Sequence, residues 1–119
     1  GNEHVLRFRL RIDGTTRTLV ASSGALRANT WAAVAATWDG ARMRVWVDGT
    51  EVGSLAATGA LTTDPGVPAA IGNQPQGGRA FDGHVDAVRL YSRALSRREL
   101  RILAGRTVRG DCRNQATFR

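Results

Sequence analysis

The stretch Thr30–Ser54, TWAAVAATWDGARMRVWVDGTEVGS, decides the fold. It contains two Asp-Gly pairs, Asp39-Gly40 and Asp48-Gly49, each between short runs rich in Val, Ala, Trp and Met. Asp-Gly supplies the positive φ angles that tight hairpin turns require, so the stretch predicts three consecutive antiparallel strands. The fold class is therefore predicted to be all-β. The expected strands are Trp31–Trp38, Arg42–Val47 and Thr50–Ala56.

The alternating segment His4–Asp13, HVLRFRLRID, lies before this stretch. Its apolar residues fall on one face of a strand, and its arginines and final aspartate fall on the other. This pattern predicts a half-buried strand, a turn at Asp13-Gly14 and a second strand over Thr16–Ala21. Further along, Ala69–Gly72 and Phe81–Tyr91 are predicted as strands.

The sequence also predicts one short C-terminal helix. Ser96 and Glu99 have the spacing of a capping box, in which each side chain bonds a backbone N–H of the other residue. We expect a helix from Arg97 to about Ala104 that ends near Gly105. We therefore divide the chain into one domain at residues 1–105 and a tail at residues 106–119, which has no periodicity.

The amino-acid composition limits the classes of ligand and function that we expect. The 119 residues include 17 arginines, no lysine and 10 acidic residues, which gives a net charge of +7. Arginine pairs with planar anions in a bidentate manner, so a polyanionic glycan is a plausible partner class on charge alone. No phosphate-binding Gly-rich loop with Lys, zinc-spaced Cys/His set, nucleophile elbow or helical DNA-reading motif occurs, so nucleic acid is not expected. No apolar run is long enough for membrane insertion.

Two segments together carry a family resemblance. The Thr30–Ser54 stretch is one, and AAIGN at 69–73 followed by FDGHVDAVRLYSRALSRREL at 81–100 is the other. Their joint pattern resembles the laminin G-like, concanavalin A-like jelly-roll superfamily, which also includes the pentraxins, over roughly residues 5–104. The resemblance implies an antiparallel two-sheet β-sandwich, a lectin-like recognition role and an extracellular or cell-surface location.

The chain departs from the family pattern in three places. Ala33 stands where the family often has His, and Ala87 stands where an acidic residue is common. The strands that usually precede the one resembled by His4–Asp13 do not occur in this sequence, so we expect it to be a fragment, a trimmed variant, or a chain whose core is completed by another copy. An incomplete sandwich exposes apolar surface and strand edges. We therefore expect a homodimer, or a partner chain that completes the sandwich.

Asp82, His84 and Asp86 lie two residues apart and so share one face of the predicted strand, where they could bind a metal or act as acid and base. The resemblance implies that glycan hydrolases of this fold use two Glu around an Asp, and this strand has no Glu. We therefore expect no enzymatic activity.

The resemblance also implies a Ca²⁺ site with Asp86 as its principal ligand, because hard oxygen donors suit this ion. Asp82, Asn73 and Asp64 are the other candidates. The alternative is that Asp86 accepts backbone hydrogen bonds while His84 is solvated.

The candidate ligand-binding residues form three groups. Arg7, Arg9 and Arg11 form a stripe with successive charges about 7 Å apart, which with arginines of the fourth strand could line one sheet face or simply be solvated. Trp46 is the aromatic expected to be exposed and could stack on a sugar ring, or it packs under arginine stems. The loop Asn73–Arg79 is polar and exposed. The full set is Arg7, Arg9, Arg11, Arg42, Arg44, Trp46, Asn73, Gln74, Gln76 and Arg79.

Two features of the tail are treated as incidental. Cys112 is the single cysteine and cannot form an internal disulfide. The tripeptide Arg109-Gly110-Asp111 matches an integrin-type adhesion motif, but so short a motif arises often by chance. The expected function is a non-catalytic carbohydrate-binding module, with a structural or assembly module as the alternative.

Overall fold

Five β-strands and one α-helix form the regular structure of residues 4–108, the part of the chain that the computed structural model describes. Cys112 and the tripeptide at 109–111 lie outside this part. The elements are β1 (Arg7–Ile12), β2 (Thr15–Val20), β3 (Val34–Trp38), β4 (Arg42–Val47), β5 (Thr50–Ala56) and α1 (Arg97–Val108).

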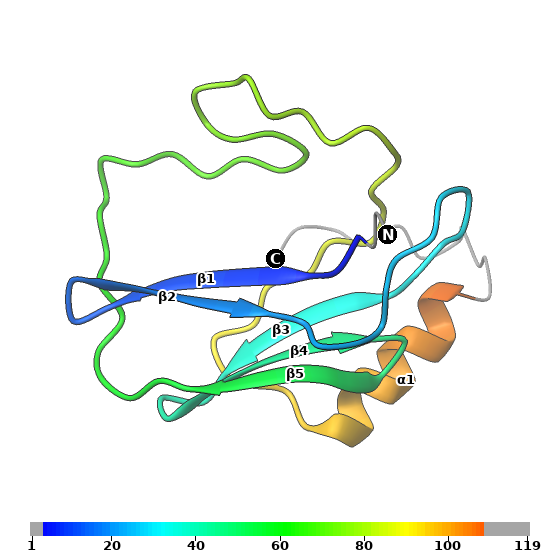
Figure 1. Cartoon of the computed structure of the whole chain (residues 1–119), viewed down its shortest axis with the longest axis horizontal. Helices are drawn as coiled ribbons and strands as arrows, with labels where there is room; N and C mark the ends of the chain where they lie inside the picture. Colours follow the sequence, from blue (N-terminus) through cyan, green and yellow to red (C-terminus); the bar gives the residue numbers. More distant parts are fainter. Residues whose placement is uncertain (1–3, 109–119) are drawn as a thin grey trace.

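The strands form two small antiparallel sheets. One sheet is the hairpin β1–β2, and the other has the order β3-β4-β5. The apolar faces of the two sheets share one core, and α1 lies on the opposite side of the three-stranded sheet (Figure 1). The described part of the chain is therefore mostly β with one short C-terminal helix.

The predicted Asp-Gly turns are confirmed. At Asp13-Gly14 and Asp48-Gly49 both residues have positive φ angles, between 48° and 79°, as a two-residue type I′ turn requires. At the third turn Gly40 has φ of 92°, while Asp39 accepts hydrogen bonds from the backbone N–H groups of Ala41 and Arg42. Local sequence therefore determines all three hairpins.

The core follows from alternation along the strands. Met43 and Val45 of β4 are fully buried and pack with Ile12 of β1 and Leu19 of β2. At Gly53 of β5 the two sheets approach closely, because a Cβ atom there would lie 3.1 Å from the Cα of Ala21. Met43 and Val45 thus mark the inward face of β4.

The capping box at the start of α1 is also confirmed. The Ser96 hydroxyl accepts a hydrogen bond from the Glu99 N–H at 3.2 Å, and the Glu99 carboxylate accepts one from the Ser96 N–H at 3.1 Å. The pKa of Glu99 is lowered to about 2, first by its hydrogen bond with Arg93 and then by that N–H group. The predicted stop near Gly105 is wrong, because α1 continues to Val108. A single glycine costs a helix only about 1 kcal/mol.

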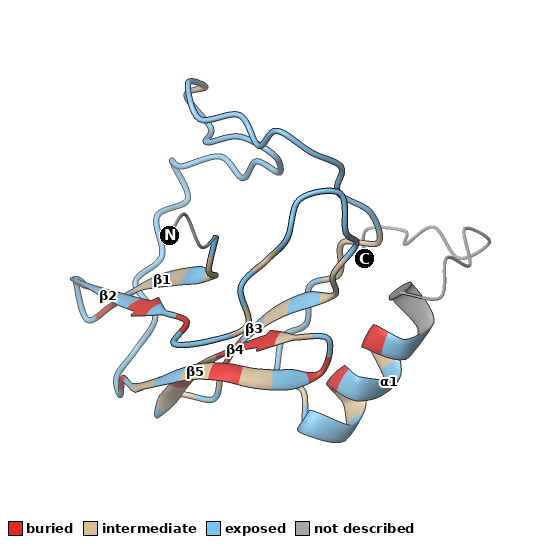
Figure 2. Ribbon diagram, turned by 45° about the vertical axis from the view of Figure 1, so that its right-hand side comes forward, coloured by how far each residue is buried: buried red, intermediate tan, exposed pale blue. Residues whose placement is uncertain are grey.

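Two predicted strands are absent from the described structure. Ala69–Gly72 and Phe81–Tyr91 have no strand partner and lie in a long irregular segment. Its first part, with Ala69–Gly72, arches over the β1–β2 side of the molecule, and its later part, with Phe81–Tyr91, runs back past the sheets toward α1 (Figure 1). This segment is largely exposed (Figure 2). Ala87, with φ of 53°, interrupts the extended backbone of the second of them. An apolar pattern forms a strand only where a partner strand supplies the hydrogen bonds.

The remaining boundaries differ slightly from expectation. β3 begins at Val34 instead of Trp31, and the N–H group of Ala33 donates to the Asp48 carboxylate at 2.9 Å. Within residues 4–108, no helix combines the length and apolar character needed to cross a membrane.

Truncation of the core tests this packing. We expect Met43→Ala to lower the free energy of unfolding by about 2–5 kcal/mol, since it removes a fully buried side chain between the sheets. Val20→Ala, at a residue that is 48% exposed, serves as the control and should change the free energy by less than about 0.5 kcal/mol. Equal losses in urea denaturation would contradict this description of the core.

Candidate ligand-binding face

The outer face of the β1–β2 sheet carries a stripe of three exposed arginines, Arg7, Arg9 and Arg11. Because side chains alternate along a strand, burial of Phe8 and Ile12 directs these arginines outward. Their cross-strand neighbours on β2 are Val20, Thr18 and Thr16, so two hydroxyl groups lie on the same face. We call Arg7, Arg9 and Arg11 the arginine stripe.

The arginine stripe rests on a hairpin that is fixed at both ends. At one end, the N–H of Ser22, just after β2, donates to the carbonyl of Val52 of β5 at 2.9 Å. At the other, the N–H of Thr62 donates to the carbonyl of Arg11 at 2.8 Å, and Ile12 forms an isolated bridge with Leu61. The backbone that carries the guanidinium groups is therefore held in place.

The charges of the stripe are largely uncompensated. Neither the Arg7 nor the Arg9 side chain forms a hydrogen bond or ion pair with another residue between positions 4 and 108. Arg11 donates from Nε to the Gly14 carbonyl at 3.1 Å, which is a neutral acceptor. The stripe thus leaves positive charge available to an incoming anion.

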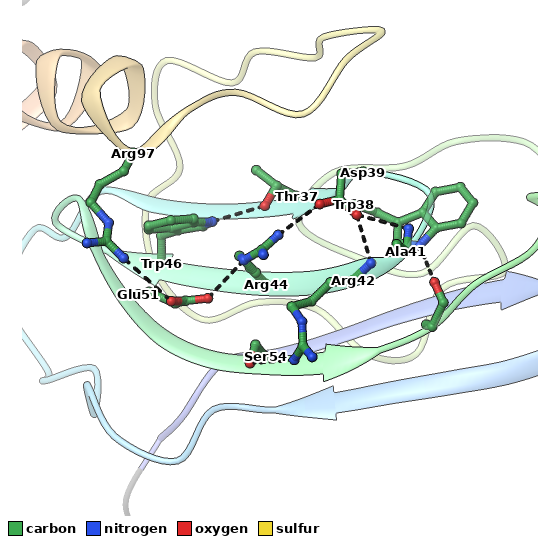
Figure 3. Close-up of polar contacts among 11 residues, drawn as sticks. Thr37, Trp38, Asp39, Ala41, Arg42, Arg44, Trp46, Glu51, Ser54 and Arg97 are labelled. Atoms are coloured by element: carbon green, nitrogen blue, oxygen red, sulfur yellow. Dashed lines mark hydrogen bonds and ion pairs between the residues drawn. The ribbon is translucent and has the colours of Figure 1, made fainter.

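The outer face of β4 is different, because its central arginine is neutralised (Figure 3). Arg44 forms ion pairs of 3.1 Å with both Asp39 and Glu51. Glu51 also lies 3.8 Å from Arg97 of α1. Arg42 donates to the Ser54 hydroxyl at 3.2 Å. This set of alternating charges connects the sheet to the helix and leaves Arg44 little capacity for an external anion.

Of the two alternatives for Trp46, packing beneath an arginine is confirmed, and exposure as a platform for a sugar ring is wrong. Its side chain is 5% exposed, and its indole N–H donates to the Thr37 hydroxyl at 3.1 Å. The Arg97 guanidinium lies over the indole, 5.9 Å from the ring centroid (Figure 3). Trp46 therefore packs beneath α1 instead of offering an open platform. Trp31, just before β3, is instead the exposed tryptophan, at 58%. The sequence pattern placed it inside a predicted strand and so did not indicate this exposure.

The structure does not join the predicted residues into one site. The arginine stripe and the pair Arg42 and Arg44 lie on the outward faces of two different sheets, whose inner faces share the core. The expectation of one arginine-lined face across these strands is therefore wrong. The irregular segment that includes the loop at residues 73–79 arches on the stripe side, away from α1 (Figure 1).

The loop at residues 73–79 is closed by its own hydrogen bonds. The side-chain carbonyl of Asn73 accepts from the backbone N–H groups of Gln74 and Arg79, both at 2.9 Å. The Gln74 amide donates to the Gly77 carbonyl at 2.6 Å. Gln76 and Arg79 are exposed. Asn73 and Gln74 thus shape the loop, and the side chains of Gln76 and Arg79 remain open to a ligand.

The predicted calcium ligands are also dispersed. Asp86 accepts a hydrogen bond from the Ala87 N–H, and Asp64 accepts one from the Gly66 N–H. Across residues 4–108, no group of three or more His, Cys, Asp or Glu side chains is placed to hold a metal ion. Calcium binding by Asp86, Asp82 and Asn73 stays a prediction.

Comparison with known proteins gives a family and a fold. A family model described as the concanavalin A-like lectin/glucanases superfamily matches residues 1–101. The crystal structure of an S-layer domain-containing protein (residues 221–444) from Clostridium thermocellum ATCC 27405 superposes with a TM-score of 0.61 at 21% sequence identity. The match covers 87% of the present chain and 64% of the other. No curated protein sequence matches the chain significantly.

The ion pairs on β4 predict an acid sensitivity. The pKa of Asp39 is lowered from 3.8 to about 2, first by the N–H groups of Ala41 and Arg42 and then by Arg44. A carboxyl whose pKa is lower in the folded state stabilises the fold above its unfolded pKa, and this stabilisation is lost as the pH falls toward about 2. We expect Asp39→Asn to reduce the fall in melting temperature between pH 5 and pH 2.

Asp82→Asn is the matched control. Asp82 forms no hydrogen bond or ion pair with the rest of the described chain, so this change should leave the acid-induced fall as it is in the parent protein. Identical pH profiles for the parent and for Asp39→Asn would show that the charged Asp39 carboxylate does not stabilise the fold.

Proposed function

The chain belongs to the concanavalin A-like lectin/glucanase superfamily, and on this basis we propose that it is a non-catalytic recognition module that binds anionic carbohydrate. The proposed architecture is the two-sheet jelly-roll sandwich of that family, and the proposed binding face is the arginine stripe on β1.

The observation that carries the proposal is the contrast between the two outer faces. Arg44 on β4 is already paired with two carboxylates, whereas Arg7 and Arg9 on β1 have no acidic partner among residues 4–108. Two guanidinium groups on one strand face therefore keep the capacity to bind an anion. Among the candidate binding residues predicted from the sequence, this contrast favours those on the outer face of β1.

The chemistry of the stripe suits uronate or sulfate groups. Each guanidinium can donate two parallel hydrogen bonds to a carboxylate or sulfate, and the stripe repeats this donor about every 7 Å along the strand. The hydroxyls of Thr16 and Thr18 beside it can bond neutral sugar hydroxyls. Because the hairpin is held at both ends, little backbone freedom is lost on binding.

A non-catalytic role is supported by the state of the glutamates. Glu51 is engaged with Arg44 and Arg97, and Glu99 is engaged with Arg93 and with the start of α1. Both carboxylates are therefore committed to structural contacts in the described part of the chain. General acid–base hydrolysis of a glycoside needs a pair of carboxyl groups that flank one bond.

We place this activity outside the cell or on its surface. The structural neighbour is named an S-layer domain-containing protein, and a polyanion-binding sandwich would suit a similar setting. Because the match spans 64% of that neighbour at 21% sequence identity, the neighbour supports the fold directly and the location only by analogy.

The alternative is a structural or assembly module. The observation that favours it is the number of large apolar side chains exposed on the irregular segment, among them Phe81, Leu90 and Tyr91. Exposed apolar patches often mark contacts with other proteins, including further copies of the same chain. A solution mass measurement distinguishes this alternative from glycan binding by a monomer.

Removal of the stripe charges tests the proposal. We expect the double variant Arg7→Gln/Arg9→Gln to bind heparin and polygalacturonate at least about tenfold more weakly than the parent, a loss of about 1.4 kcal/mol. Neutral dextran should not bind either protein. Binding measured by calorimetry should also weaken as salt rises from 50 to 300 mM, because exposed charges are screened.

Two single variants serve as controls. Arg17→Gln removes the same charge from β2, but Arg17 pairs with Leu10 and so lies on the other face of the hairpin. Arg44→Gln removes an arginine that is already paired. Both variants should bind with near-parental affinity. An equal loss of affinity in all variants would show that only the net charge of the protein matters, and it would overturn the assignment of the stripe. Loss of binding in EDTA would instead support the calcium prediction.

A further inference from the structure

We propose that the open edge of β3, together with the apolar groove beside it, is a docking site for an extended peptide strand of a partner protein. The partner strand would carry apolar side chains at alternate positions and an acidic residue near Arg7. This site shares Arg7 with the arginine stripe but does not depend on glycan binding.

The first observation is the hydrogen-bonding direction along β3. The Asp48 N–H donates to the Ala33 carbonyl at 2.7 Å, and the Asp39 N–H donates to the Arg42 carbonyl at 3.4 Å. In an antiparallel pair, alternate residues direct both backbone groups toward the same neighbour. The odd-numbered residues from Ala33 to Asp39 therefore bond β4, and Val34, Ala36 and Trp38 direct their N–H and carbonyl groups to the open edge.

This edge has no backbone partner and no protective residue. Among residues 4–108, no backbone hydrogen bond reaches Val34, Ala36 or Trp38 from outside the β3–β4 ladder. Its sequence, VAATW, contains neither a charge nor a proline, which are the features that usually prevent strand addition at an edge. The N–H and carbonyl groups are thus free to pair with an incoming strand.

The second observation is the groove between the two sheets at this edge. A cavity of about 160 Å³ is lined by Phe8 of β1 and Leu6 just before it, by Val34 and Ala36 of β3, and by Val45 of β4. Val34 is 52% exposed, so the groove opens to solvent. Residues directly opposite each other in a ladder share a face. The partner residues opposite Val34 and Ala36 would therefore project into the groove.

The charge around the groove indicates which kind of partner strand it would bind. Arg7 lines it and has no acidic contact among the described residues, so an acidic side chain of the partner is favoured at that end. A second copy of the chain would approach with the same net charge of +7, which disfavours self-pairing at low salt. Strand addition of this kind gives affinity through main-chain hydrogen bonds and specificity through alternate side chains.

Amide hydrogen exchange with a designed probe tests the proposal. The probe is the blocked peptide acetyl-Glu-Val-Thr-Val-Thr-Val-Glu-amide, which has alternate apolar residues and acidic ends. At about 90% saturation we expect exchange at Val34, Ala36 and Trp38 to slow roughly tenfold, because bound molecules are protected. Exchange at Ala35 and Thr37, whose amides already bond β4, should not change.

A backbone-methylated peptide supplies the control that needs no change in the protein. Methyl groups on the three alternate amide nitrogens that would face β3 remove the pairing donors and keep every side chain. This peptide should give no protection. Protection equal to that of the unmethylated peptide would overturn strand addition, and so would the absence of protection by either peptide.

Two protein variants complete the experiment. Ala36→Pro removes an N–H that faces the open edge and none that bonds β4, so it should abolish peptide protection while an edge strand tolerates it. Val34→Asp places a negative charge at the groove and should weaken peptide binding at least tenfold. Melting curves establish that both variants fold. Edge protection that rises with protein concentration without peptide would assign the edge to a second copy and overturn the proposal.

Discussion

The shared core of the two sheets is the constraint on which the rest of the structure depends. Burial of Met43 and Val45 against Ile12 and Leu19 fixes which face of each strand points inward. Once those faces are fixed, alternation places the arginines of β1 on one outer surface and those of β4 on the opposite one. The position of every candidate binding residue on the strands is therefore a consequence of apolar packing.

The two arginine faces differ because of their neighbours. On β4, the hairpin turn brings Asp39 beside Arg44, and the ladder with β5 brings Glu51 to the same residue. On β1, the cross-strand neighbours are threonines and a valine, which carry no charge. The same residue type is thus a structural ion-pair partner on one sheet and an open cation on the other. Net charge alone could not distinguish the two.

The sequence predicted the features that depend on local chemistry. Asp-Gly turns, strand alternation and the capping box need only residues close in the chain, and the predictions at Asp13-Gly14, Asp48-Gly49 and Ser96 are confirmed. Burial of Trp46 depends on where α1 packs, which no local pattern specifies. The strand predicted at Phe81–Tyr91 needed a partner strand that the described chain does not supply. The alternation of apolar and polar residues in this segment was therefore not sufficient to predict a strand.

Strand β1 belongs to both proposed sites. Its outer face carries the arginine stripe, while Phe8 of β1 and Leu6 just before it form one wall of the groove. A peptide strand that fills the groove would pack beneath the backbone that presents Arg7 and Arg9. Because the hairpin is already held at both ends, this would change its backbone freedom little. Arg7, which lines the groove and carries part of the stripe, would instead couple the two sites, because an acidic peptide and an anionic glycan would compete for its one charge.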